Sequence, residues 1–75
     1  MKRKLSFKEQ RELDGLPERI ATLEGELTAL RAESESGDFY KAGGDRIRAV
    51  LARIEDAGQE LESAIARWME LEERR

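Results

Sequence analysis

The chain contains no cysteine and no histidine among its 75 residues. These absences exclude disulfide bonds, thiol nucleophiles, imidazole acid–base catalysis and zinc sites of the usual type. Its only glycine pair, Gly43-Gly44, lacks the strand and lysine of a phosphate-binding loop. We therefore expect no catalytic residue, no metal site and no cofactor. The absence of cysteine is also typical of a reducing compartment, and we expect a cytoplasmic protein.

Long apolar runs are absent as well. A membrane-spanning helix needs about 20 mostly apolar residues, and the basic N-terminus is not followed by the apolar core of a signal peptide. We therefore expect no membrane partner. Charged residues make up 41% of the chain, a proportion that suits a highly solvated pair of helices.

Two ladders of apolar residues occupy the two halves of the chain. The first consists of Leu13, Leu16, Ile20, Leu23, Leu27 and Leu30. The second consists of Ile47, Leu51, Ile54, Gly58, Leu61, Ile65 and Trp68. Alternating steps of three and four residues are typical of a coiled-coil seam. Because the stretch between the ladders is polar and rich in glycine, the two helices should fold back on each other.

Local signals predict where the helices begin and end. Ser6 and Glu9 have the spacing of a capping box. Gly15 and Pro17 indicate a kink or brief break, and Asp45 is a suitable N-cap for the last helix. We divide the single domain, residues 1–75, into a basic segment 1–6, a short helix 7–14, a helix 17–35, a tip loop 36–45 and a helix 46–73.

The predicted fold is all-α, an antiparallel two-helix coiled-coil hairpin. The short N-terminal helix should pack against the end of the long C-terminal helix. Folding at the midpoint predicts that Leu23 lies opposite Gly58 and Leu13 opposite Trp68. Phe7 should join Trp68 in an aromatic plug at the open end of the hairpin.

A third apolar row on the last helix has two interpretations. It consists of Val50, Ala57, Ala64 and Leu71, spaced by seven residues. We favour the interpretation that small residues here let the helices approach closely and let long polar side chains lie across them. The alternative is a surface for weak self-association or docking.

Positive charge is concentrated at the N-terminus, although the formal net charge is −3. The candidates there for binding nucleic acid are Lys2, Arg3, Lys4, Lys8 and Arg11. Three further candidates, Arg46, Arg53 and Arg67, share a heptad position that we place on the outer face. Backbone phosphates require only suitably spaced cations. The alternative for the helical arginines is pairing with a carboxylate three or four residues away.

An aromatic pair lies at the predicted tip. Tyr40, beside Phe39, is a candidate for stacking on an unpaired base. The alternative, which we favour, is that these aromatics fold down over the last layer of the core.

Several motifs together resemble the C-terminal domain of ABC-F proteins, the soluble ATP-binding-cassette family without a membrane domain. They are KLSFKEQREL at 4–13, LPERI at 16–20, DFY at 38–40 and RWMEL at 67–71. The resemblance implies a coiled-coil hairpin at the end of a tandem ATPase, associated with DNA binding, in a family that acts around the ribosome. It points to Lys4, Lys8, Arg11 and the tip residues.

We therefore predict a non-catalytic accessory domain that binds nucleic acid weakly and without sequence specificity. Its partners would be DNA, or ribosomal RNA, and the ATPase domains of the parent chain. The alternative is a structural or protein-interaction coiled coil that acts as a spacer, a ribosome-contacting element or a self-association element. Steep salt dependence would distinguish phosphate binding from helix docking.

Overall fold

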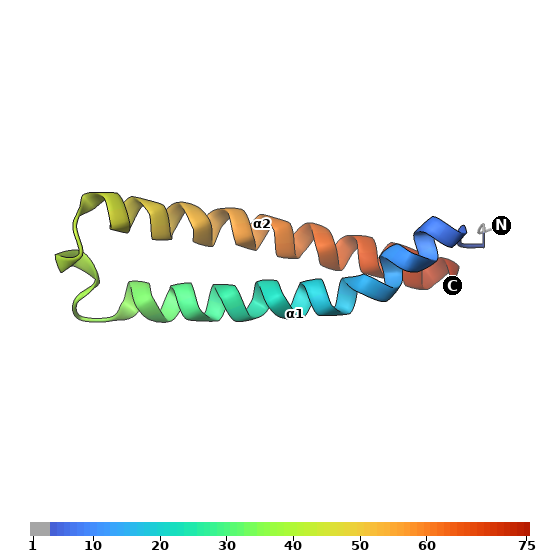
Figure 1. The fold of residues 1–75 in the computed structure, drawn as a ribbon, viewed down its shortest axis with the longest axis horizontal. Helices are drawn as coiled ribbons and strands as arrows, with labels where there is room; N and C mark the ends of the chain where they lie inside the picture. The colour runs from blue at the N-terminus through green and yellow to red at the C-terminus, as the bar shows by residue number, and fades with distance from the viewer. Residues whose placement is uncertain (1–3) are drawn as a thin grey trace.

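The computed structural model describes residues 4–75 of the chain. Its elements are the helix α1 (Phe7–Glu35), the short 3-10 helix η1 (Phe39–Lys41) and the helix α2 (Gly44–Arg74). The two long helices lie side by side and antiparallel, and the molecule measures 55 × 16 × 15 Å (Figure 1). The predicted all-α hairpin is therefore confirmed.

The predicted capping box starts α1. The amide of Glu9 donates to Ser6 Oγ at 3.1 Å, and the amide of Ser6 donates to Glu9 Oε1 at 3.0 Å. Two amides that a helix leaves without partners are thus satisfied. The first turn of α1 is consequently held in a defined position.

The expected break in the first half is absent, because α1 runs without interruption from Phe7 to Glu35. Gly15 does not have the positive φ that a helix-terminating glycine would need. Pro17 removes one amide donor, but contacts of Leu16 before it and Leu23 after it with the core hold the chain helical on both sides of it. Figure 1 shows that the blue N-terminal part of α1 instead changes direction and crosses the end of α2.

The tip divides its two aromatic residues between core and solvent. Phe39 is 2% exposed and closes the core, whereas Tyr40 is 74% exposed and meets Phe39 edge to face. Gly43 has φ 100°, a conformation that strongly favours glycine, and it is the N-cap of α2. Asp45, the expected N-cap, lies instead in the first turn.

The seam of α2 uses a different row of residues from the one predicted. The buried residues of α2 are Val50, Ala57, Ala64 and Leu71, which we interpreted as a third row. Partly buried Ile54, Leu61 and Trp68 complete the seam against Leu13, Leu16, Leu23 and Leu27 of α1. Leu51 and Ile65, expected in the seam, are 48% and 38% exposed. The row of small residues is therefore buried between the helices, as we favoured, and it is not a surface for self-association.

The predicted opposition of Leu23 and Gly58 is wrong for the same reason. A Cβ atom added to Gly58 would meet nothing within 4 Å. The ion pairs Glu26–Arg53 and Arg19–Glu60 bracket this layer. Between Arg53 and Glu60 on α2, the fully buried residue is Ala57.

The open end is closed by Leu5, Trp68 and Leu71 without the ring of Phe7. Phe7 is 80% exposed, so its predicted contact with Trp68 is wrong. Leu71 is fully buried, and Leu5 and Trp68 pack against the same core as partly buried residues. Closure without Phe7 leaves the first turn of α1 free to present its outer face to solvent.

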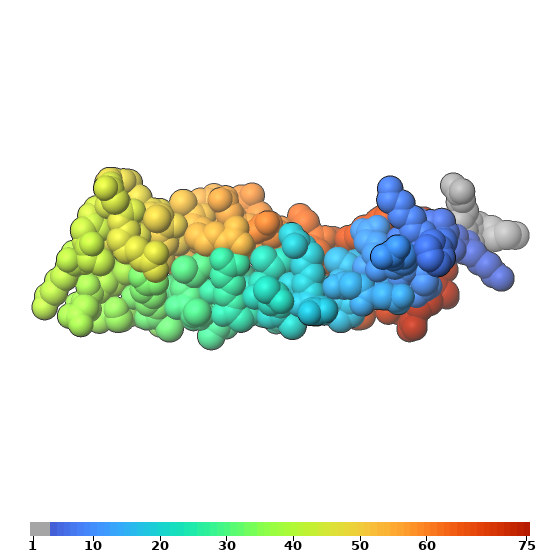
Figure 2. Space-filling view, viewed as in Figure 1, coloured from blue at the N-terminus to red at the C-terminus, as the bar shows by residue number. Residues whose placement is uncertain are grey.

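The space-filling view shows the two helices in contact along most of their length (Figure 2). In the same view, the blue N-terminal segment lies over the red end of α2. Within residues 4–75, neither helix has an apolar stretch of the length required to span a membrane.

Candidate nucleic-acid interface

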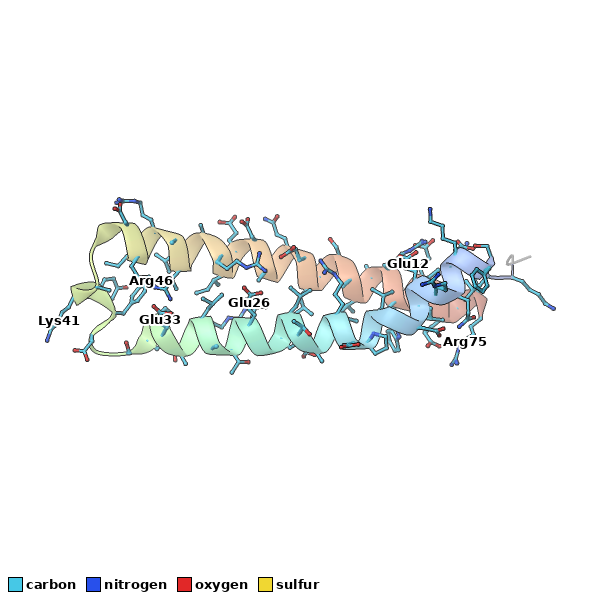
Figure 3. The ribbon with its side chains drawn as sticks, in the orientation of Figure 1. Glu12, Glu26, Glu33, Lys41, Arg46 and Arg75 are labelled. Atoms are coloured by element: carbon cyan, nitrogen blue, oxygen red, sulfur yellow. The ribbon has the colours of Figure 1, made fainter. Side chains whose placement is uncertain are left out.

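Three two-bond ion pairs join the helices, spaced by seven and then by fourteen residues along each helix. Arg46 donates to Glu33 at 2.8 and 2.6 Å, and Figure 3 shows the two side chains directed toward each other near the tip. The same geometry joins Arg53 to Glu26, at 2.6 and 2.7 Å. The third pair joins Arg67 to Glu12, at 2.7 and 2.9 Å. Two parallel hydrogen bonds give each pair a fixed orientation.

These arginines are the three helical candidates for phosphate binding, and they do not lie on the outer face as expected. Each lies at the edge of the seam and is neutralised from the opposite helix. The pKa of Arg53 is raised, chiefly by its hydrogen bonds to Glu26, and that of Arg67 is raised, chiefly by Glu12. Of the pairs expected within one helix, Arg67–Glu70 is present at 3.3 Å. A phosphate would have to displace a bound carboxylate to reach any of the three.

A fourth pair in this ladder has its charges reversed. Arg19 on α1 meets Glu60 on α2 at 3.6 Å, whereas the other rungs place the acid on α1. Sliding one helix by a heptad would bring Glu26 beside Glu60, and Arg19 beside another arginine. The reversed rung therefore disfavours wrong registers through like-charge repulsion. This reversed pair could have been predicted from the sequence, because charged residues recur at heptad spacing beside both ladders.

The open end carries cations without ion-pair partners. Lys4, Lys8 and Arg11 are exposed, and within residues 4–75 no carboxylate forms an ion pair with any of them. Lys8 and Arg11 are one helical turn apart, so they share a face of α1. Lys2 and Arg3, the remaining N-terminal candidates, lie outside the described residues.

Glu9 is the one acidic residue in the first eleven, and its carboxylate is engaged elsewhere. It accepts the Ser6 amide and pairs with Arg74 of α2. Arg67 approaches the same carboxylate at 3.9 Å. Because Arg74 and Arg67 of α2 engage this carboxylate, Glu9 forms no ion pair with the neighbouring Lys8 or Arg11.

Tyr40 is separated from these cations by the length of the molecule. It lies at the tip of a hairpin whose long axis is 55 Å, while Lys4, Lys8 and Arg11 lie at the open end (Figure 1). Its neighbour Lys41 pairs with Asp38 at 3.7 Å. The structure thus brings the N-terminal candidates together and leaves the tip candidate apart from them.

The ion pairs predict a specific response to acid. The pKa of Glu9 is lowered from 4.5 to about 2, first by the backbone hydrogen bond from Ser6 and then by Arg74. Hydrogen bonds from arginines lower the pKa values of Glu12, Glu26 and Glu33 as well. A carboxyl group with a depressed folded-state pKa stabilises the fold fully above its unfolded pKa, and this contribution is lost as pH falls through the folded value.

We therefore expect the thermal midpoint to be nearly constant from pH 7 down to about pH 5, and then to fall between about pH 4.5 and 2. Circular dichroism at 222 nm, recorded against temperature at each pH, measures this. Glu9→Gln should lower the midpoint at pH 7 and make the acid limb shallower. If the midpoint of the variant fell with pH in parallel with that of the unmodified protein, Glu9 would not contribute to the acid sensitivity of the fold.

Comparison with known proteins identifies the family. The protein-family model described as ABC transporter C-terminal domain matches residues 4–73, and the chain belongs to this family. The chain is 44% identical over 72 residues to the ATP-binding protein Uup of Haemophilus influenzae, covering 96% of this chain and 11% of that protein. It is 42% identical over 69 residues to the ATP-binding protein Uup of Escherichia coli, covering 92% and 11%. No solved structure matches the chain.

These findings confirm the resemblance to an ABC-F C-terminal domain, in this case a Uup-like one. The chain spans 11% of the length of both Uup proteins. Residues 4–75 form a helical hairpin, and the matched family is that of a C-terminal domain of these proteins.

Proposed function

We propose that this Uup-like accessory domain binds nucleic acid, DNA in preference to RNA, through backbone phosphates at its open end. The binding is weak and independent of sequence. The observation that carries the proposal is the group of exposed cations without ion pairs, Lys4, Lys8 and Arg11, on a hairpin whose other cations are mostly paired.

The partition of charge in the hairpin supports this proposal. Ion pairs engage Arg19, Lys41, Arg46, Arg48, Arg53, Arg67, Arg74 and Arg75. Within residues 4–75, this leaves Arg31 and the three cations of the open end. A cation that already neutralises a carboxylate gains little from a phosphate, whereas a solvated one releases the phosphate's counterions on binding. Nucleic acid is therefore expected at the open end rather than along the shaft.

The names of the relatives suggest the setting in which this domain acts. The Uup proteins are named ATP-binding proteins, and this chain corresponds to about a tenth of their length. The parent chain would supply the ATPase domains and act on nucleic acid, or around the ribosome, in the cytoplasm. A rigid hairpin 55 Å long would then hold its contact with nucleic acid at a fixed place relative to those domains.

A second candidate function is that of a spacer or protein-docking coiled coil. It is favoured by the neutralised arginines and by the exposed apolar side chains of Leu51, Ile65 and Met69 on α2. Docking through apolar side chains would depend little on salt, whereas phosphate binding would depend on it steeply. Salt dependence thus separates the two functions.

The experiment that tests the proposal is a titration of labelled duplex DNA at several salt concentrations. Replacing Lys4, Lys8 and Arg11 together with Gln should reduce the slope of log affinity against log salt by up to about 2.7, at ~0.9 per phosphate contact. Arg11→Gln alone should reduce it by about 0.9.

Arg31→Gln is the matched control for this titration. Arg31 is likewise exposed, lies on α1 and has no ion pair within the described chain, but it is distant from the open end. Its replacement makes the same change in net charge and should leave the slope unaltered. No binding of DNA or RNA at low salt, or equal effects of Arg11→Gln and Arg31→Gln, would contradict the proposal.

A further inference from the structure

An exposed phenyl ring lies among the cations of the open end. Phe7 is 80% exposed, the highest exposure among the large hydrophobic side chains of the described residues. It is the first residue of α1, adjacent to Lys8 and one turn before Arg11. Residues four apart on a helix are neighbours on its surface, so the ring and the Arg11 guanidinium share a face.

We propose that Phe7 is a stacking platform for unpaired bases, so that the open end prefers single-stranded nucleic acid and junctions to continuous duplex. This inference rests on the proposed function, because the surrounding cations are the groups that would hold the phosphates. It adds a site that distinguishes unpaired from paired bases, whereas the cations contact only the backbone.

The fold does not use the Phe7 ring for its core. Leu5, Trp68 and fully buried Leu71 close the open end without it. A phenyl group left in water loses the stabilisation that burial would give it. Exposure of the largest apolar side chain of this turn, beside Lys8 and Arg11, therefore indicates a contact with a ligand that offers both apolar faces and negative charge.

The Phe7 ring is also attached to a well-fixed piece of backbone. The capping box of Ser6 and Glu9 holds the first turn, and the Glu9–Arg74 ion pair ties that turn to α2. A platform that is already positioned loses little conformational entropy when a ligand binds. Phe7, Lys8 and Arg11 can thus act together without rearrangement of the hairpin.

The chemistry of this group matches a single strand better than other polyanions. Every base has a π face that can stack on an aromatic ring, and cations beside the ring contact the adjoining phosphates. Within a duplex, both faces of each base are already covered by neighbouring base pairs. The ring should therefore add affinity for unpaired bases and leave duplex binding to the cations alone.

Fluorescence anisotropy with a labelled 20-nucleotide single strand and the matching duplex tests this inference. Phe7→Ala should weaken single-strand binding by about 5- to 150-fold, the range typical of one lost base–aromatic stack. Duplex binding should change by less than twofold. Equal losses for single strand and duplex, or no loss for either, would overturn the inference.

Two further variants test whether the aromatic face itself is required. Phe7→Tyr retains the ring and should retain single-strand affinity. Phe7→Leu retains an apolar side chain without a π face and should lose affinity as the alanine variant does. If Phe7→Leu bound normally, or if the domain bound anionic phosphatidylserine vesicles in preference to the single strand, the ring would be an apolar anchor and stacking would be excluded.

Tyr40→Ala is the matched aromatic control. Tyr40 is 74% exposed, but it lies at the tip beside Lys41, which is already paired with Asp38. Its removal should leave single-strand affinity unchanged, and a loss equal to that of Phe7→Ala would contradict the assignment of the site to the open end. If Phe7→Ala left single-strand affinity unchanged while Arg11→Gln lowered the salt slope as expected, only the stacking inference would be overturned. If the domain bound no nucleic acid at all, the proposed function would be overturned as well.

Discussion

Leu27→Ala should lower the free energy of unfolding by about 2–5 kcal/mol, the usual cost of truncating a buried leucine. Leu27 is 2% exposed and belongs to the cluster that joins the two helices. Residues 4–75 form one core cluster between two helices, so no second core is available there to compensate for the cavity. A small domain of this length is stable by only about 5–15 kcal/mol, so the loss is a substantial fraction of the total.

Urea denaturation followed by circular dichroism measures this loss, and Leu51→Ala is its control. Leu51 is 48% exposed beside the seam, so the same truncation should cost less than about 1 kcal/mol there. Similar losses for the two variants would place Leu51 in the seam and contradict the packing described here.

The hairpin itself could be predicted from sequence because two independent signals agree. Alternating steps of three and four apolar residues define two amphipathic helices, and a polar stretch containing Gly43 and Gly44 separates them. The capping box of Ser6 and Glu9 was predictable because it depends only on neighbours in the chain. Such local signals do not require knowledge of how the helices face each other.

The row of α2 that enters the seam could not be chosen from apolar spacing. One row of the α2 seam consists of Ile47, Ile54, Leu61 and Trp68. The second row of the seam could be that of Leu51 or that of Val50, since both give alternating steps of three and four residues. The larger side chains of the Leu51 row favoured the wrong choice. Close approach of the helices instead requires small residues, so Ala57 and Ala64 are buried.

Charge complementarity contains the information that apolar spacing lacks. Arg53 and Arg67 flank the Val50 row, and their carboxylate partners Glu26 and Glu12 are separated on α1 by the same interval of two heptads. Burying the Val50 row brings these charges together, whereas burying the Leu51 row would turn the arginines away. Interpretation of the arginines as outward-facing and choice of the wrong row were therefore the same error.

The candidate site was predictable only in part, for a related physical reason. The excess of positive charge at the N-terminus is visible in the sequence, but its availability depends on partners brought from the other helix. Arg74 pairs with Glu9, and no carboxylate of residues 4–75 forms an ion pair with Lys8 or Arg11. Exposure of Phe7 could not be foreseen, because an aromatic ring near Trp68 in the predicted register resembles a core residue.

Substitutions at two adjacent positions of α2 should have opposite effects on stability. Ala57 is fully buried in the seam, so Ala57→Leu should overpack the layer and lower the free energy of unfolding by about 1–3 kcal/mol. Gly58 has no neighbour within 4 Å of an added Cβ atom. Gly58→Ala should therefore raise the free energy of unfolding by about 0.5–1 kcal/mol, since alanine is the better helix former.

This pair of variants tests the register more sharply than either one alone. If the row of Gly58 were in the seam, Gly58→Ala would crowd the layer, and Ala57→Leu would only add an exposed side chain. Gly58→Ala would then lower the free energy of unfolding, and Ala57→Leu would leave it almost unchanged. Thermal and urea unfolding of both proteins measures these changes, and at ~4–8 °C per kcal/mol for a domain of this size the midpoints should separate clearly. A stabilising Ala57→Leu would be incompatible with a seam in which small residues allow the close approach of α1 and α2.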